Sequence, residues 1–373
     1  MTPSLPATQE GARLAALRTL LDALSLDGML LSSTSNKRHY SGFRLSDAEG
    51  PTSGFAGTLL VTRDASIILA DSRYTEQATQ EAPGWDLVMT TGPLHEEVPA
   101  LLVEHGIGAL GMEAGVVSHA DWSALAAAAP GTELHDIGDE LVPLRIRKSP
   151  EEIDAIGRAC ALTDACFDHL VAWIRPGMTE REVAWELEGY FRSHGAEGLA
   201  FDTIVLAGPR AAMPHGRPSE ATVEPGNVLL IDFGCTVDGY RSDMTRTLLV
   251  GDVPDEIRRY HDAVREAQAA ALDAVAIGVN GQDLDAIARK RIEREGVPSY
   301  GHGLGHGIGR DTHEPPRLRA SEAFTLEAGM VFSVEPGIYL PGMTGIRIED
   351  IVALEADGPR LLTNAPREAI TIP

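Results

Sequence analysis

Four carboxylates that stand in or beside apolar runs constrain this chain more than any other feature. Asp232 ends the run 228–232, Glu335 ends the run 331–335, and Asp243 and Glu349 lie in two further runs, 241–247 and 346–350. A buried and unpaired charge is strongly unfavourable, and no lysine accompanies these acids. The sequence therefore predicts that the four carboxylates meet around a bound cation.

The runs that carry these acids belong to a repeat. The segment that begins Gly177-Met178-Thr179 recurs as the segment that begins Gly278-Val279-Asn280, at an offset of 278 − 177 = 101. Asp232 recurs as Glu335 at 335 − 232 = 103. Each half reads as two helices followed by acid-bearing strands, which predicts a duplicated, pseudo-symmetric domain over 148–373.

Turn signals indicate how the acids approach one another within each half. Asp238-Gly239 is a hairpin signal between two strand-like runs, and folding there sets Asp232 roughly opposite Asp243. The longer turn 340–345 sets Glu335 roughly opposite Glu349. The repeat then predicts that the two hairpins face each other.

The N-terminal part, residues 1–147, reads as a separate α/β domain without a catalytic constellation. Helical and strand patterns alternate along it, and a short basic link near 144–148 closes it. We expect a helix over 10–25, a strand over 29–31, a hairpin formed by 57–62 and 66–70, and a helix that begins at Asp71. The fold class is therefore mixed α/β (α+β) in two domains. Ser149 with Glu152, and Thr179 with Glu182, predict capping boxes at two helices of the second domain.

Composition limits the partners. The formal net charge is 31 − 55 = −24, which argues against nucleic acid or an anionic membrane as a partner. Three cysteines without a Cys-x-x-Cys spacing fit a reducing compartment, and the N-terminus shows no apolar signal segment. No run approaches the length of a membrane span. We expect a cytoplasmic protein.

The acids and one histidine define the kind of metal site. Four carboxylates carry about −4, which two divalent ions balance and one does not, and two ions can share bridging carboxylates. His306, in the glycine-rich run 302–309, is the best imidazole ligand, and His302 is expected to hydrogen-bond nearby. The glycines argue against a helical His-x-x-x-His pair. Oxygen ligands with one imidazole suit Mn, with Co or Zn as alternatives.

Two further histidines stand in loop-like segments, His215 before Gly216 and His313 before Glu314. Loops at the mouth of a site supply polar groups to a substrate. On chemistry alone each is as well explained by a structural role as by substrate contact.

Several of these motifs together resemble the prolidase and aminopeptidase P branch of the pita-bread metallopeptidases. The resemblance rests on Asp232-Phe-Gly, Ser242-Asp243-Met-Thr-Arg-Thr, His302-Gly-Leu-Gly-His306-Gly-Ile-Gly, His313-Glu-Pro, Glu335-Pro-Gly and Arg347-Ile-Glu349-Asp. The N-terminal part resembles the creatinase/prolidase N-terminal domain through Tyr40-Ser-Gly-Phe and Asp71-Ser-Arg-Tyr. The resemblance covers nearly the whole chain.

The resemblance implies an exopeptidase that hydrolyses Xaa-Pro bonds with a hydroxide bridging two metal ions. It implies five ligands, of which Asp243 and Glu349 would bridge: Asp232, Asp243, His306, Glu335 and Glu349. Glu335 would also shuttle a proton. Residues expected to bind substrate or stabilise the tetrahedral intermediate are His215, His302, His313, Tyr339 and Arg347. It further implies small proline-containing peptides as substrates and a homodimer.

Alternatives remain open from sequence alone. The enzyme would be an Xaa-Pro dipeptidase if a cation holds the proline carboxylate, and an Xaa-Pro aminopeptidase if that side is open. A creatinase-like amidinohydrolase would not need the intact ligand set, and the N-terminal domain argues against a methionine aminopeptidase. A non-catalytic pita-bread module that binds peptides or partners usually lacks ligands, whereas all five stand here.

Overall fold

Residues 7–45 and 56–373 are described in the computed structural model of this chain, and the chain divides into two units, Met1–Arg145 and Ile146–Pro373. Each unit has its own sheets and its own buried core. The sequence predicts a boundary between 147 and 148, and the structural division lies between 145 and 146.

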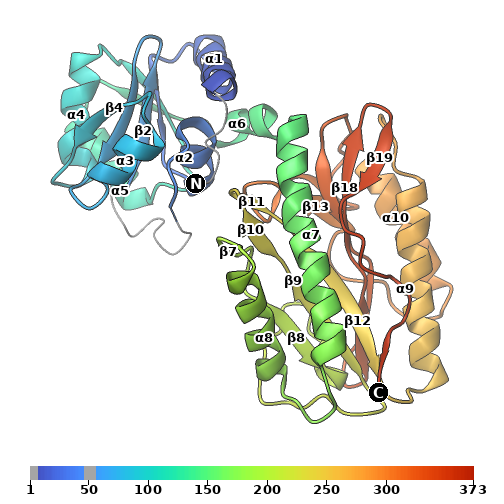
Figure 1. The fold of residues 1–373 in the computed structure, drawn as a ribbon. Coiled ribbons are helices and arrows are strands. Elements are labelled where there is room, and N and C mark those ends of the chain that lie inside the picture. The colour runs from blue at the N-terminus through green and yellow to red at the C-terminus, as the bar shows by residue number, and fades with distance from the viewer. Residues whose placement is uncertain (1–6, 46–55) are drawn as a thin grey trace. The chain divides into compact units, whose positions relative to one another are not determined.

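A six-stranded mixed sheet with the order β4-β3-β2-β1-β5-β6 forms the centre of the first unit (Figure 1). Neighbouring residues of its strands point to opposite faces, and both faces are covered. Leu30 packs in one cluster and Leu31 in the other. The elements are α1 Ala7–Ala23, β1 Gly28–Leu31, α2 Thr34–Ser41, β2 Thr58–Thr62, β3 Ser66–Ala70, α3 Thr75–Glu81, β4 Asp86–Met89, α4 Leu94–Glu104, β5 Ala109–Met112, α5 His119–Ala128, β6 Glu133–Asp136 and α6 Gly138–Arg145.

The predicted hairpin is confirmed, since β2 and β3 pair antiparallel. The predicted start of a helix at Asp71 is wrong, because α3 begins at Thr75. The Asp71 carboxylate accepts the backbone N–H of Arg73 at 2.9 Å, and the Asp71 carbonyl accepts that of Tyr74 at 3.0 Å. Asp71 therefore stabilises a turn, a role that aspartate side chains commonly take in competition with a helix.

Four long helices run along the outside of the strands in the second unit (Figure 1). Helices α7 and α8 pack on β8, β9 and β12 through residues such as Phe167, Leu187 and Ile231. The elements are α7 Pro150–Trp173, α8 Glu180–Ser193, β7 Gly198–Leu199, β8 Ile204–Ala207, the 3₁₀ turn η2 Gly208–Ala212, β9 Val228–Phe233, β10 Cys235–Val237, β11 Tyr240–Arg241, β12 Met244–Val250, α9 Asp255–Asp273, α10 Gly281–Glu293, β13 Gly305–Gly307, β14 Glu314–Leu318, β15 Val331–Val334, β16 Gly337–Leu340, β17 Thr344–Arg347, β18 Asp350–Glu355, β19 Gly358–Leu361 and β20 Thr371–Ile372.

The predicted repeat is visible in the backbone of this unit. The isolated bridge Thr179↔Thr222 in the first half has a counterpart, Asn280↔Thr325, in the second. Gly177 and Gly278 both take a left-handed conformation, with φ of 91° and 87°. Both predicted capping boxes are present at α7 and α8, with Ser149 and Thr179 as the caps. The duplication thus extends to the turns that orient the helices.

The acid-bearing strands lie close to the predicted arrangement. Asp238 and Gly239, with φ of 52° and 73°, form the turn between β10 and β11. In the β9–β12 ladder the partner of Asp232 is Thr245, two residues beyond Asp243. Asp243 itself precedes β12, so the hairpin is confirmed and the expected pairing is displaced.

In the second half, β15 and β18 pair with Val334 opposite Asp350. Glu335 and Glu349 are the next residues beyond this pair, so they lie opposite each other, as predicted. Among the described helices none is both long and apolar enough to cross a membrane.

Candidate metal centre

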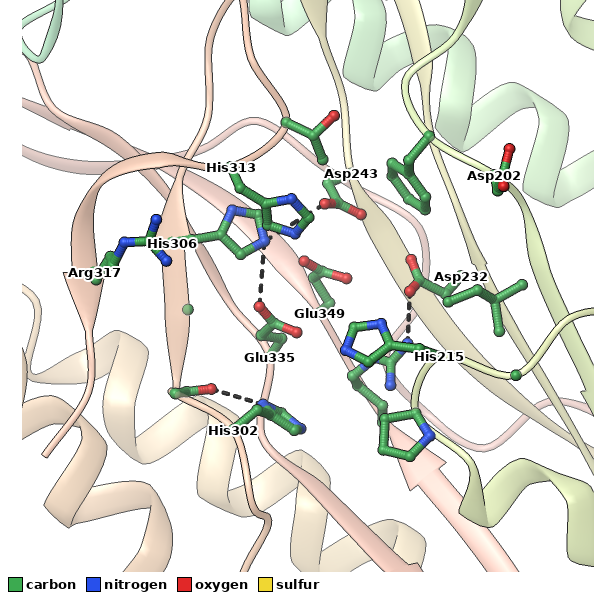
Figure 2. Close-up of a pocket in the computed structure, with 18 of the residues that line it drawn as sticks. Asp202, His215, Asp232, Asp243, His302, His306, His313, Arg317, Glu335 and Glu349 are labelled. Carbon is green, nitrogen blue, oxygen red and sulfur yellow. Dashed lines mark hydrogen bonds and ion pairs between the residues drawn. The ribbon is translucent and has the colours of Figure 1, made fainter. Parts of the chain in front are cut away.

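One cavity of about 530 Å³ in the second unit is lined by all five predicted metal ligands (Figure 2). Asp232 comes from β9, Asp243 from the approach to β12, and His306 from β13. Glu335 and Glu349 stand at the ends of β15 and β18. The two halves of the repeat thus deliver carboxylates to one space.

The imidazole of His306 faces the acids. Its Nε2 lies 3.4 Å from Glu335 Oε1 and 3.7 Å from Asp243 Oδ2. Ligand atoms of Asp243, His306 and Glu349 all lie within 4.8 Å of one another. His306 Nδ1 lies 3.1 Å from the Gly307 carbonyl, so the N–H sits on Nδ1 and Nε2 is left as an acceptor.

Glycines explain how His306 reaches this position. A side chain at Gly305 would collide with the Ser333 carbonyl of β15, and one at Gly307 would collide with the Pro315 carbonyl. Glycine alone allows such close approach of neighbouring backbones. The middle of the glycine-rich run, Gly305–Gly307, is therefore a tightly packed strand, and the prediction that the run is not a helix is confirmed.

Arg347 orients the acid on the far side of the cavity. Its guanidinium donates to Asp232 Oδ2 at 2.6 Å, to Tyr339 Oη at 2.9 Å and to Thr245 Oγ1 at 3.0 Å. The Tyr339 hydroxyl lies 2.9 Å from His302 Nε2. This chain of contacts links His302, Tyr339 and Arg347 to a ligand of the site.

Thr245 positions another acid. Its hydroxyl donates to Glu349 Oε2 at 2.8 Å, and its backbone carbonyl accepts the N–H of Glu349 at 3.1 Å. Thr245 stands in the Asp243-Met-Thr motif but is not among the predicted site residues. A threonine two residues beyond an expected ligand on a strand was the available signal, since both side chains then lie on the same face.

The site carries an excess of negative charge. Burial raises the pKa of Asp243 well above its ordinary value, and the Glu349 carboxylate raises it further. Burial and the neighbouring Glu335 likewise raise the pKa of Glu349. Burial also raises the pKa of Glu335 and lowers that of His306. Deprotonated acids and a neutral imidazole are the forms that bind metal, so an added cation would offset both the burial and the mutual repulsion of the acids.

The donor set fits divalent ions. Three buried carboxylate oxygens, Asp232 Oδ1, Asp243 Oδ1 and Glu349 Oε1, have no hydrogen-bond partner within the described part of the chain. Unsatisfied oxygens of this kind are expected where an ion would bind. The residues could therefore hold Mn²⁺ or another oxygen-preferring ion.

The predicted substrate residues fall into two groups. His215, His302, His313 and Arg347 line the cavity, and Figure 2 shows the first three around the acids. The rings of His313 and His306 lie 4.3 Å apart, and burial lowers the pKa of His313 to about 4. Tyr339 is not among the described residues that line the cavity. Its hydroxyl instead contacts Arg347 and His302, which supports them from behind.

The structure adds lining residues that sequence reasoning missed. Two arginines, Arg317 and Arg319, come from β14 and the residue after it, and Phe201 comes from the segment between β7 and β8. Asp202 and Arg217 also line the cavity and form an ion pair at 2.8 Å. Figure 2 places Arg317 and Asp202 on opposite sides of the acids. No motif marked these residues, because only the fold brings their loops together.

Comparison with known proteins gives matches along nearly the whole chain. Residues 154–356 match metallopeptidase family M24, and residues 13–147 match the creatinase/prolidase N-terminal domain. An Xaa-Pro dipeptidase of Pyrococcus furiosus is 34% identical over 96% of this chain and 99% of its own.

Solved structures agree. An Xaa-Pro dipeptidase from Bacillus anthracis has a TM-score of 0.90 and 35% identity, covering 97% of this chain and 99% of its own. An X-Pro aminopeptidase from Thermotoga maritima has a TM-score of 0.88 and 36% identity, covering 96% of this chain and 99% of its own. Both named activities therefore occur among proteins of this fold at similar identity.

Proposed function

This chain belongs to metallopeptidase family M24, and on that premise we propose that it is a metal-dependent exopeptidase that hydrolyses the bond between a first residue and proline. One observation carries the proposal: four carboxylates and an imidazole that faces them line a single cavity. Xaa-Pro peptidases of this fold match the chain over nearly its whole length. Neither a creatinase-like activity nor a purely binding role requires this complete donor set.

We propose that the site holds two divalent ions, with Mn²⁺ as the native metal. The family implies divalent ions, and the charge of about −4 on the acids supports the number two. Such ions would supply Lewis acidity to the scissile carbonyl and lower the pKa of water. Asp232, Asp243, His306, Glu335 and Glu349 would hold them, with Asp243 and Glu349 in bridging positions.

The chain's own groups would handle protons and charge. Glu335 Oε1 lies 3.4 Å from His306 Nε2, and its carboxylate would accept a proton and return it to the leaving amine. His313 stays neutral well below pH 7, so its N–H can donate to the oxyanion that develops on the scissile carbonyl. We assign His215, on the loop before Gly216, the same kind of contact.

We further propose that the preferred substrate is an Xaa-Pro dipeptide. A dipeptidase must hold the proline carboxylate, and Arg317 supplies a cation in the cavity wall, whereas the neighbouring Arg319 is paired with Glu322 at 2.7 Å. Arginine binds carboxylates in bidentate geometry.

Two further statements belong to this proposal. The family resemblance supports a homodimer, which light scattering coupled to gel filtration would test. The three cysteines, Cys160, Cys166 and Cys235, are all free and buried, which is compatible with the reducing cytoplasm.

The test uses full-length protein stripped of metal and reloaded with Mn²⁺, Co²⁺ or Zn²⁺. Release of alanine is measured from Ala-Pro, Ala-Pro-amide and Ala-Pro-Ala, with Ala-Ala as the control for proline dependence. We expect cleavage of Ala-Pro, much slower cleavage of its amide, and about two metal ions per chain by elemental analysis.

Each other outcome is informative. Efficient cleavage of Ala-Pro-Ala would contradict the dipeptidase proposal and show that the protein is an Xaa-Pro aminopeptidase. Equal rates on Ala-Pro and Ala-Ala would contradict proline specificity. No cleavage of any peptide with any metal would overturn the catalytic proposal.

A further inference from the structure

A fully buried glutamine lies behind the two glutamates of the site. Gln268 stands on α9 with no exposed surface. Its Nε2 lies 3.1 Å from the Val334 carbonyl, 3.3 Å from the Ile348 carbonyl and 2.8 Å from Asp350 Oδ2. The mechanism outlined above does not use this residue.

The two carbonyls are those of the residues immediately before Glu335 and Glu349. Val334 is the last residue of β15, and Ile348 lies between β17 and β18. One side-chain amide therefore joins the two backbone segments at the points where they deliver the glutamates. Its hydrogen bonds bridge these segments next to the end of the β15–β18 ladder.

The orientation of this amide is fixed by chemistry. All three neighbouring atoms are oxygens that only accept, so the NH₂ group must face them. Gln268 Oε1 is consequently left without a hydrogen-bond partner in the described part of the chain. An unsatisfied buried oxygen is unfavourable. An apolar side chain of the same size would fill this space without an unsatisfied oxygen.

The other half of the repeat contains a similar contact. Thr163 on α7 lies with its Oγ1 2.7 Å from Ser242 Oγ, and Ser242 immediately precedes Asp243. In both halves, then, a polar residue of the first helix contacts the segment just before a metal ligand. Gln268 differs in contacting two such segments at once.

We propose that Gln268 is a positioning residue that sets the separation of Glu335 and Glu349 and thereby the affinity of the site for divalent ions. This inference rests on the proposed function, because it assumes that these glutamates bind metal. Hydrogen-bonding partners behind metal ligands typically contribute 10- to 100-fold to metal affinity or activity.

The test compares Gln268→Met, which keeps the volume but removes both donors, with wild type and with Val264→Ala. Val264 is fully buried on the same helix and its side chain has no hydrogen-bonding group, so its variant loses core packing without removing a hydrogen bond. Mn²⁺ affinity is measured by calorimetry, and the Co²⁺-loaded proteins are compared by visible absorption. Gln268→Asn, which keeps an amide but withdraws it by one methylene, serves if the methionine variant does not fold.

We expect Gln268→Met to bind Mn²⁺ at least tenfold more weakly, to change the Co²⁺ spectrum, and to lower kcat with little change in KM. Gln268→Asn should show a smaller loss of the same kind, and Val264→Ala should bind Mn²⁺ as wild type does. Affinity within twofold of wild type and an unchanged spectrum would overturn the proposal. An equal loss of Mn²⁺ affinity in Val264→Ala would also overturn it, since general destabilisation of the fold would then explain the effect of Gln268→Met. Failure of wild type itself to bind metal would instead refute the proposed function.

Discussion

Replacing one acid of the metal centre by its amide should stabilise the metal-free protein while weakening metal binding. Ligand atoms of Asp243 and Glu349 lie within 4.8 Å. At an effective dielectric constant of 20, two unit charges at that distance repel by about 3.5 kcal/mol. Protons retained by the acids relieve part of this repulsion, as their raised pKa values indicate. We therefore expect Asp243→Asn to raise the free energy of unfolding by about 1–3 kcal/mol in EDTA at pH 8.

The pH dependence has a defined sign. Because the pKa of Asp243 is raised in the folded state, its contribution to stability is complete below the ordinary carboxylate pKa of about 4 and is lost as pH rises through the folded value. The stability difference between Asp243→Asn and wild type should thus be small near pH 4 and widen toward pH 8.

The assay is thermal unfolding with and without metal. A change of 1 kcal/mol shifts Tm by about 2–4 °C for a domain of this size. Saturating Mn²⁺ should give wild type the higher Tm. A ligand at 100 times its Kd adds about 2.7 kcal/mol to the free energy of unfolding of wild type, and the same Mn²⁺ concentration adds less to that of the variant. Asp202→Asn is the matched control, since Asp202 lines the same cavity but is largely exposed. A Tm of Asp243→Asn below that of wild type in EDTA at pH 8 would refute the electrostatic argument.

Three other perturbations test separate parts of the site. Glu349→Ala should lower kcat/KM more than about a thousandfold, about 4 kcal/mol of barrier, with the fold intact by circular dichroism, and activity within tenfold of wild type would contradict its role as a ligand. Gly305→Ala should weaken Mn²⁺ binding, because the new methyl group collides with the Ser333 carbonyl and displaces His306, and wild-type affinity would contradict that account. His313→Gln should not change how kcat/KM varies between pH 7 and pH 6, because His313, with a pKa of about 4, is neutral throughout that range. If kcat/KM of wild type falls in this range and that of the variant does not, His313 titrates there and the prediction is wrong.

The tertiary structure also shows why the acidic site does not disrupt the fold. Arg347 pairs with one oxygen of Asp232, Oδ2, at 2.6 Å, and the Thr245 hydroxyl donates to Glu349. Asp350 is removed from the site and paired with Arg246 at 2.7 Å and with Arg367 at 2.5 Å. Removing one partner of a buried ion pair typically costs 3–5 kcal/mol. These contacts confine the excess charge to the groups that would bind metal.

The sequence by itself predicted most of the elements and the five residues that the structure brings to one cavity. Apolar runs ending in acids, two capping boxes and the Asp238-Gly239 turn are local signals, and each acts over a few residues. The repeat extended that local information, because two halves with the same pattern bury their acids in the same way.

Only the tertiary structure decided which groups surround the five proposed ligands. The cavity arginines, the Asp202–Arg217 pair and the contacts of Gln268 with Val334 and Ile348 join residues far apart in the chain. Such contacts depend on the register of strands and on how loops cross, and a one-residue shift in register would turn each side chain to the opposite face. The sequence therefore specified the chemistry of the centre, and packing specified its walls and its supports.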